Sequence, residues 1–145
     1  MPGQDQSRRN QQVVTEFRAH GGEVGGYYTG FSLLLLTTTG ARSGRSHTTP
    51  LSYLADSGRY IVVAAAGGAP AHPDWYYNLI AHPRVTVEAG TEVFDAAAIV
   101  TSGQERDALF ERFAARYPQL VVYRGRTTRP VPVFALHRRE DGGMT

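Results

Sequence analysis

The chain has 145 residues, 41% of them hydrophobic and 19% charged, which suits one domain with a real core and is too short for two. Cysteine is absent, which excludes disulfides, thiolate metal sites and a cysteine nucleophile. All fifteen basic residues are arginine and the net charge is +2, too mild for a nucleic-acid-binding surface. The N-terminus has no apolar run and the longest apolar stretches are strand-sized, so we expect a cytoplasmic protein without a secretory signal or a membrane span.

Residues 1–30 are expected to form a flexible or partly helical N-terminal arm. A short helix is predicted over 9–20, with Val13, Val14 and Phe17 on one side, and the glycines that follow would end it. Two apolar contacts per turn are few, so a partly ordered arm is the default interpretation. The alternatives are that this basic segment lies peripherally on the inner face of the membrane or folds over a ligand.

The middle of the chain is predicted to be rich in strands. Buried or paired strands are expected over 31–38, 48–54 and 59–65. The Asp56-Ser57-Gly58 turn between the last two is typical of a β-hairpin. A short helix over 70–82 follows, with Pro73 at its first helical position.

The rest of the chain continues this pattern. A second hairpin is predicted from strands over 84–88 and 92–101, and Ser102-Gly103-Gln104-Glu105 has the spacing of a capping box that opens a helix to about residue 117. A last strand is expected over 131–137, and 139–145 form a loose tail. Hairpin connections imply antiparallel pairing, so residues 31–138 are expected to form a mainly β (α+β) domain, a small antiparallel barrel with flanking helices.

The loop between the first two strands is the first candidate site. It brings two glycines together with Arg42, Ser43, Arg45 and His47. Glycines let backbone N–H groups converge, and arginine forks match phosphate and carboxylate oxygens. The loop lacks both the Walker and the Rossmann glycine patterns. An ordinary solvated hairpin loop would have the same composition, and composition alone does not decide between the two.

A strand of alanines that ends in Gly67-Gly68 is the second candidate. Such a strand lets a flat molecule approach the backbone closely, and a helix N-terminus follows it. Trp75 and Asn78 are three residues apart and lie on one face of that helix. The alternative is that Trp75 and Leu79 belong to the core.

Tyrosines and arginines alternate over residues 117–129, which is the third candidate. They could wall a pocket for an aromatic substrate, but spacing alone favours an ordinary connecting loop. No metal-binding cluster and no nucleophile with a base partner can be read from the sequence. Binding loops with few acid–base groups indicate that a cofactor carries the reaction.

Two long stretches, LLLLTTTGARSGRSHTTPLSYL and YIVVAAAGGAPAHPDWYYNLIAHPRVTVE, resemble the deazaflavin (F420)-dependent nitroreductases, the F420H2-dependent quinone and nitro reductases of actinobacteria. The resemblance covers roughly residues 30–138. It implies a split β-barrel of the flavin-reductase-like kind. It also implies coenzyme F420 as cofactor, with hydride passing from the deazaflavin C5 to a quinone, nitroaromatic or activated enone.

The same resemblance assigns residues to the cofactor. The phosphate and oligoglutamate tail would lie against Arg42, Ser43, Arg45 and His47. The deazaflavin ring would lie along Thr49, Pro50 and Leu51 and along the backbone of Ala65, Ala66, Gly67 and Gly68, with Trp75 and Asn78 on its other side. Tyr123, and Tyr117 as second choice, match tyrosines that border the substrate pocket of relatives and would donate a hydrogen bond or a proton to the acceptor oxygen.

The chain departs from the family pattern at a few positions. Ala65 and Ala66 stand where relatives usually have a serine and a lysine, and Ala41 replaces a basic residue. Losing the lysine removes a cation from the tail site, which Arg45 partly replaces. Two other functions stay open: an FMN-dependent reductase on the same barrel, and a deazaflavin or lipid carrier without turnover.

Overall fold

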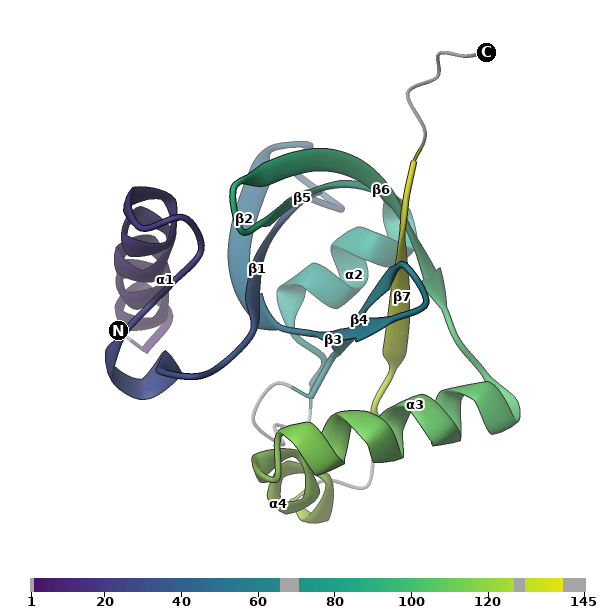
Figure 1. Ribbon diagram of the computed structural model, residues 1–145. Helices are drawn as coiled ribbons and strands as arrows, with labels where there is room; N and C mark the ends of the chain where they lie inside the picture. Colours follow the sequence, from purple (N-terminus) through teal and green to yellow (C-terminus); the bar gives the residue numbers. More distant parts are fainter. Residues whose placement is uncertain (1, 66–70, 127–129, 140–145) are drawn as a thin grey trace.

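The computed structural model describes residues 2–65, 71–126 and 130–139 (Figure 1). Its strands are β1 (Leu33–Thr39), β2 (Ser46–Ser52), β3 (Leu54–Asp56), β4 (Arg59–Val63), β5 (Arg84–Ala89), β6 (Glu92–Val100) and β7 (Val133–Arg138). Its helices are α1 (Pro2–Ala19), α2 (Asp74–Ala81), α3 (Gly103–Arg116) and α4 (Gln119–Gly125), with a 3₁₀ turn, η1 (Gly26–Tyr28), between α1 and β1.

These strands form one antiparallel sheet that curls into a barrel. The order across the sheet is β2-β1-β5-β6-β7-β4-β3, so β2 and β3 lie at opposite edges. Tyr53 alone separates the end of β2 from the start of β3, and one residue can join two edges only if the sheet curls back on itself. The predicted antiparallel barrel with flanking helices is therefore confirmed (Figure 1).

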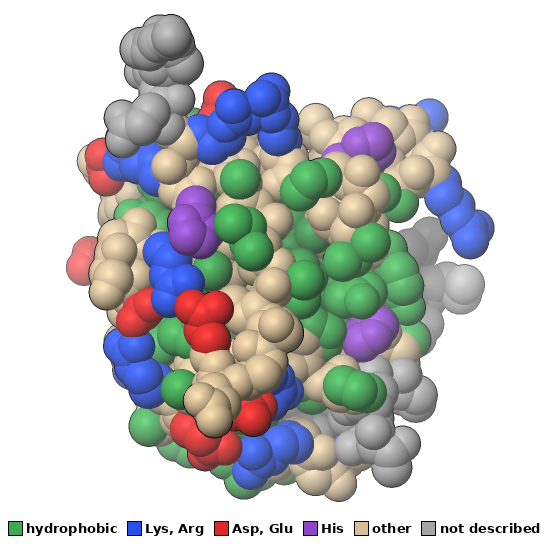
Figure 2. Space-filling view, turned by 90° about the vertical axis from the view of Figure 1, so that its right-hand side faces the viewer, with side chains coloured by type: hydrophobic (Ala, Val, Ile, Leu, Met, Phe, Trp, Pro, Cys, Tyr) green, Lys and Arg blue, Asp and Glu red, His purple; other side chains and the backbone are tan. Residues whose placement is uncertain are grey.

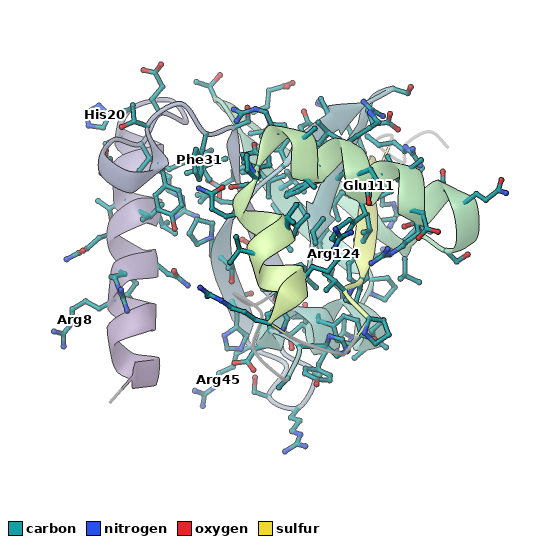
Figure 3. The ribbon with its side chains drawn as sticks, turned by 90° about the horizontal axis from the view of Figure 1, so that it is seen from below. Arg8, His20, Phe31, Arg45, Glu111 and Arg124 are labelled. Carbon is teal, nitrogen blue, oxygen red and sulfur yellow. The ribbon has the colours of Figure 1, made fainter. Side chains whose placement is uncertain are left out.

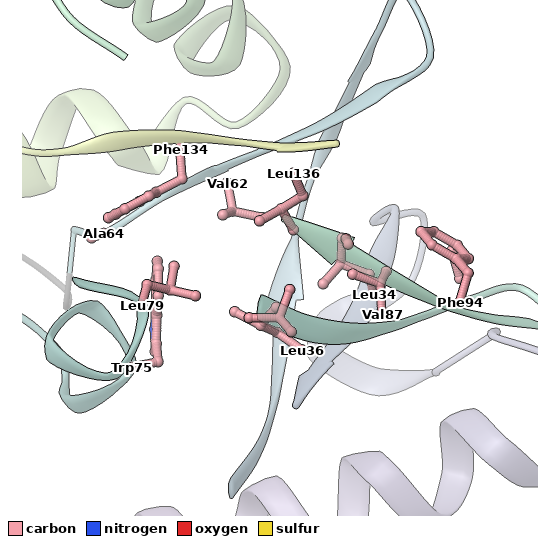
Figure 4. Packing of buried hydrophobic residues seen from close by; sticks show 13 residues of the cluster. Leu34, Leu36, Val62, Ala64, Trp75, Leu79, Val87, Phe94, Phe134 and Leu136 are labelled. Atoms are coloured by element: carbon pink, nitrogen blue, oxygen red, sulfur yellow. The ribbon is translucent and has the colours of Figure 1, made fainter. Parts of the chain in front are cut away.

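The barrel interior holds the largest cluster of buried apolar side chains. Leu34 and Leu36 point inward from β1, as Phe134 and Leu136 do from β7 (Figure 4). Helix α2 covers one end of the barrel and contributes Trp75 and Leu79 to the same cluster. The remaining members are Val62, Ala64, Val85, Val87, Ala89, Phe94 and Ala96. The barrel is thus filled by side chains rather than open along its axis.

Helices cover two parts of the outer face of the sheet. Leu33 and Leu35 alternate with the inward leucines of β1 and pack against Phe17 of α1, which explains the unbroken run of four leucines in a strand buried on both faces. On the other side, α3 and α4 cover Ile61 and Ala135 with an apolar stripe that includes Phe110 and Leu120.

Several element boundaries differ from the prediction. Helix α1 spans Pro2–Ala19, longer than the segment predicted over 9–20. The second strand ends at Ser52, and its last predicted residue, Leu54, opens β3 instead. Helix α2 begins at Asp74, and Pro73 is its N-cap rather than its first helical residue.

Two predictions around α3 need correction. Ser102 occupies the N-cap with extended backbone angles, but its side chain makes no capping hydrogen bond, so the capping box does not form. Residues 119–125, predicted to belong to a connecting loop, form helix α4. This helix depends on packing, because Leu120 is buried against α3 while its neighbours Val121 and Val122 are exposed and poor helix formers.

Exposed apolar side chains gather on the face opposite α1. Among the large exposed ones are Tyr77 and Ile80 on α2 and Ile99 and Val100 at the end of β6. Figure 2 shows hydrophobic side chains together over part of this face. Over the described residues, none of the helices has the length and hydrophobicity needed to cross a bilayer.

Candidate functional site

The loop that joins β1 to β2 is a tight turn closed by its own hydrogen bonds. The Gly40 N–H donates to the Arg45 carbonyl at 2.7 Å, and the Gly44 N–H donates to the Gly40 carbonyl at 3.0 Å. The Arg45 N–H donates to the Ser43 hydroxyl oxygen at 3.1 Å. Gly44 has a φ of 71°, a left-handed conformation that glycine adopts at little cost. The loop therefore has a defined shape, which a purely solvated connection does not require.

Gly40 sits in close contact with two predicted ligands of the anion. A Cβ added at this position would lie 2.5 Å from the Ser43 hydroxyl oxygen and 3.0 Å from Nε2 of His47. Absence of a side chain at residue 40 thus lets Ser43 and His47 approach each other across the loop. The glycine is required here by space, because its backbone is not in the left-handed region.

The side chain of Asn78 on α2 connects this loop to the helix. Its Oδ1 accepts a hydrogen bond from the Ala41 N–H at 2.9 Å, and its Nδ2 donates to the Thr38 hydroxyl at 3.0 Å. The backbone N–H can only donate, which fixes the orientation of the amide. Asn78 is 8% exposed, and both polar ends of its side chain are used within the protein. It joins α2 to the end of β1 and to the start of the loop.

Several hydrogen-bond donors of the loop are not used within the described part of the protein and are available to an anion. The backbone N–H groups of Arg42 and Ser43 make no hydrogen bond to the described residues, and the side chains of Arg42, Arg45 and His47 are exposed. Figure 3 shows Arg45 at this end of the molecule. Two guanidinium groups beside two free N–H groups are the chemistry that a phosphate or a carboxylate chain binds. The loop is therefore compatible with the anionic tail that the family resemblance assigns to it, and contact with that tail stays a prediction.

The residues expected to line the ring lie on β2 and after β4. Thr49 and Leu51 are half-buried, and Pro50 is buried on β2, an edge strand where a residue without N–H is tolerated. Ala65 follows β4 and is nearly buried among side chains of the α3 cluster. Ala66, Gly67 and Gly68 lie outside the described residues.

Trp75 packs into the barrel rather than lying on its surface. It is 7% exposed, and its ring centroid lies 6.1 Å from that of Phe134 at an interplanar angle of 61° (Figure 4). The structure thus places Trp75 and Asn78 on one turn of α2, with the indole in the core and the amide against the hairpin loop. Contact of Trp75 with a cofactor stays a prediction.

Tyr117 lies away from the hairpin loop. It is 5% exposed, and its hydroxyl donates to the Tyr53 carbonyl at 2.8 Å, with the Ser32 carbonyl at 3.2 Å sharing the proton. Its ring is 5.5 Å from that of Phe31. The Tyr117 hydroxyl therefore links the end of α3 to Tyr53, the residue that connects β2 and β3. This geometry favours a structural role for Tyr117.

The backbone of Tyr123 belongs to helix α4, whereas its side chain is outside the part that the structure describes. Its predicted role therefore stays a prediction. The nearby Arg124 pairs with Glu111 of α3 at 3.3 Å and lies over the ring of Phe110, so the two helices are linked by charge as well as by apolar contact (Figure 3).

Tyr53 is a tyrosine that sequence reasoning did not select. Burial, with Tyr60 and Tyr117 nearby, raises the pKa of the Tyr53 phenol above its ordinary value of 10.0, so it stays protonated at neutral pH. Its ring lies 5.1 Å from that of Tyr60, which contacts Phe94 in turn. Tyr53 and Tyr60 are brought together by the local β3–β4 hairpin, whereas Phe94 on β6 reaches Tyr60 only when the barrel closes, so the local sequence carries no signal for the complete cluster. Within the described residues, no group of three His, Asp or Glu side chains is placed to hold a metal.

Comparison with known proteins gives consistent matches. The profile of the F420H(2)-dependent quinone reductase family matches residues 8–138. An F420H(2)-dependent quinone reductase of Mycobacterium tuberculosis is 39% identical over 112 residues, which are 73% of each chain.

Solved structures agree with these matches. An F420-H2-dependent reductase superposes with a TM-score of 0.68 and 38% identity, over 73% of this chain and 94% of that one. A protein described as a domain-swapped dimer superposes with a TM-score of 0.70 and 34% identity, over 93% of this chain and 99% of that one. A haem storage protein of Vibrio cholerae, 17% identical with a TM-score of 0.57, shares the fold alone. The predicted split barrel of the flavin-reductase-like kind is confirmed by these neighbours.

Proposed function

The chain belongs to the F420H(2)-dependent quinone reductase family, and from that premise we propose that it reduces a small electron-poor acceptor by hydride transfer. Membership makes the protein an oxidoreductase whose cofactor is reduced F420. The bound cofactor supplies a hydride from its deazaflavin C5. A quinone takes up that hydride and one proton and becomes a hydroquinone.

The arrangement of the β1–β2 loop is the observation that carries the proposal. Arg42 and Arg45 would present guanidinium groups to the anionic tail, and the N–H groups of Arg42 and Ser43 have no hydrogen-bond partner among the described residues. Asn78 holds the loop in place before any ligand arrives. Such pre-organisation lowers the entropy cost of ordering the loop on binding.

The remaining predicted contacts would orient the ring. Thr49 and Leu51 on β2 would lie along one side of it, with the chain from Ala65 to Gly68 as a platform of little bulk. Trp75 would act from the core, by fixing the position of α2 and thereby of Asn78. The protein's part in the reaction is then to hold C5 and the acceptor in line.

Acceptor chemistry would extend beyond quinones. Nitroaromatics and activated enones also take up a hydride at an electron-poor centre and place the resulting negative charge on oxygen. A positioned phenol would stabilise that charge and deliver a proton. We assign this role to Tyr123 rather than to Tyr117, because the Tyr117 hydroxyl already donates to backbone carbonyls.

The direct test is oxidation of reduced F420 by the purified protein, with and without menadione, followed by the absorbance of the oxidised deazaflavin. Menadione-dependent oxidation supports the proposal. Cofactor binding without turnover would instead support a carrier, and turnover with reduced FMN but not with reduced F420 would support a flavin reductase.

Replacement of Tyr123 by phenylalanine tests the proton donor. Turnover with menadione should fall about tenfold, less than the roughly 10²–10³ lost with one donor of a closed oxyanion site, because water replaces the hydroxyl in an open pocket. Affinity for F420 should stay nearly unchanged. Equal loss of cofactor affinity would place Tyr123 in the cofactor site, and unchanged turnover would remove it from the mechanism.

A further inference from the structure

Tyr117 occupies the junction between helices α3 and α4. Its N–H donates to the carbonyl of Phe113, in the last turn of α3, at 2.9 Å. Its carbonyl accepts a hydrogen bond from the N–H of Leu120, in the first turn of α4, at 3.0 Å. The backbone of Tyr117 therefore takes part in both helix ends, so a displacement of this residue also displaces the start of α4.

The side chain of Tyr117 attaches this junction to the sheet. Its hydroxyl lies 2.8 Å from the Tyr53 carbonyl and 3.2 Å from the Ser32 carbonyl, and the Ser32 carbonyl also accepts the Tyr53 N–H at 3.0 Å. Ser32 directly precedes β1, and Tyr53 joins β2 to β3. Tyr117 is buried, so these hydrogen bonds are sheltered from water. One phenol thus connects the end of β2 with the start of α4.

Other contacts hold the Tyr117 ring in this direction. The Arg116 guanidinium lies 4.6 Å from the ring centroid and donates to the Gly30 carbonyl at 2.6 Å. The rings of Phe31 and Phe113 have their centroids 5.5 and 4.8 Å from that of Tyr117. These contacts use the ring and not the hydroxyl. They remain when phenylalanine replaces the tyrosine, so a Tyr117→Phe variant should fold.

The two elements that this phenol connects are those that the proposed function places on either side of the reaction. Thr49 and Leu51 on β2 would lie along the deazaflavin ring, and Tyr123 on α4 would donate to the acceptor oxygen. We propose that Tyr117 is a positioning residue, whose hydroxyl fixes α4 relative to β2 and thereby the place of Tyr123 relative to the ring. The inference rests on the proposed function, because it requires the ring on β2 and the donor on α4.

A double-mutant cycle measures the effect on the reaction. Tyr117→Phe should lower kcat with menadione about fivefold, which corresponds to about 1 kcal/mol, the net value of one hydrogen bond. Affinity for F420 should stay unchanged, because the contacts assigned to β2 and to the β1–β2 loop remain. In the Tyr123→Phe background the same change should cost less than about twofold, because the donor that Tyr117 positions is already absent. An undiminished loss in that background would overturn the inference, since Tyr117 would then act independently of Tyr123.

Amide hydrogen exchange of the cofactor-free protein tests the link between Tyr117 and α4 without turnover. In Tyr117→Phe the N–H groups of Leu120 and Val121, which open α4, should exchange faster, while those in the middle of α3 should keep their rates. Unchanged exchange at the start of α4 would overturn the inference.

Tyr60→Phe is the matched control for both measurements. Tyr60 is half-buried and its ring lies 5.1 Å from that of Tyr53, but its hydroxyl makes no hydrogen bond to the described residues. Neither the exchange rates of α4 nor kcat should change in this variant, and an equal change there would overturn the inference. Lack of menadione turnover by the native protein would instead overturn the proposed function, and the exchange rates would still decide whether the Tyr117 hydroxyl fixes α4.

Discussion

Asn78 organises the β1–β2 loop through the two ends of its side-chain amide. The side-chain amide of Asn78 forms hydrogen bonds with the Thr38 hydroxyl and with the Ala41 N–H. The position of the loop therefore depends on α2 and not on the sequence of the loop alone. Arg42 and Arg45, in contrast, extend from the loop into solvent. Under the proposed function, Asn78 shapes the site and the arginines bind the ligand, so the two kinds of residue should respond differently to substitution.

Arg42→Ala tests the binding residues. A sheltered charge-assisted hydrogen bond is worth about 1.5–3 kcal/mol and a wet one less, so F420 affinity should fall roughly tenfold. Stability should be unchanged, because the Arg42 guanidinium makes no bond to the described residues. Fluorescence titration measures the first and urea unfolding the second. Undiminished affinity would remove the loop from the cofactor site.

Asn78→Ala tests the residues that shape the site. It leaves the buried Thr38 hydroxyl without its donor and the part-buried Ala41 N–H without its acceptor, which costs about 1–3 kcal/mol of unfolding free energy. Affinity for F420 should fall as well, while the tail-less deazaflavin chromophore should bind as before. Ile80→Ala, on the exposed side of the same helix, serves as control. Equal loss for both ligands would mean that Asn78 contacts the ring.

At the scale of elements, ion pairs fasten the β3–β4 hairpin to α3. Asp56 accepts hydrogen bonds from Arg59 on β4 and from Arg112 on α3, and Arg59 also pairs with Glu105 at 3.2 Å. Arg59 first, and then Arg112, hold the pKa of the Asp56 carboxyl below its ordinary value of 3.8. The carboxylate therefore stabilises the folded protein above pH 4, and this contribution is lost as the pH falls through the lowered pKa.

Asp56→Asn should accordingly destabilise the protein at neutral pH and less at pH 3, because below the ordinary pKa of 3.8 the unfolded state takes up the proton and the contribution of the carboxylate declines. Urea unfolding at several pH values measures the difference. Asp107→Asn is the matched control, because Asp107 is exposed and pairs only with its neighbour Arg106 among the described residues. A destabilisation that does not change with pH would show that the carboxylate is not the source of the effect.

On the scale of the whole molecule, β1 connects two hydrophobic clusters. Leu34 and Leu36 fill the barrel, while Leu33 and Leu35 pack under α1. Arg18 of α1 also pairs with Glu88 of β5 at 2.7 Å. Detaching α1 would expose one face of a strand whose other face forms the core, so α1 and the barrel should unfold together.

Phe17→Ala tests this coupling. The Phe17 ring is 1% exposed, so its removal should cost roughly 3–5 kcal/mol of unfolding free energy. The midpoints of helical circular dichroism and of fluorescence from Trp75, the single tryptophan, should shift by the same amount. Val93→Ala, at an exposed position of β6, should shift neither. Loss of helical signal ahead of the fluorescence change would show that α1 unfolds independently.

Local patterns in the sequence determined much of this protein. Hairpin turns such as Asp56-Ser57-Gly58, apolar runs such as 33–36 and the stripe that starts at Leu109 predict strands, antiparallel pairing and α3, because each depends on neighbours a few residues away. The glycines and arginines of the β1–β2 loop suit an anion-binding turn, which is also a local structure, but their composition suits a solvated loop equally well, so the tail site stays a prediction.

Tertiary structure decided the rest, because the forces involved act between distant residues. Helix α1 is fixed by packing on Leu33 and Leu35, and α4 by packing on α3. The Tyr117 phenol bonds a carbonyl 64 residues away, and Asn78 reaches back 40 residues to Thr38. Side chains of four strands, β1, β2, β5 and β6, together with Arg139 after β7, line one polar groove on the barrel. Spacing along the chain carries no information about such contacts, which exist only once the sheet has curled and placed its outer face under the helices.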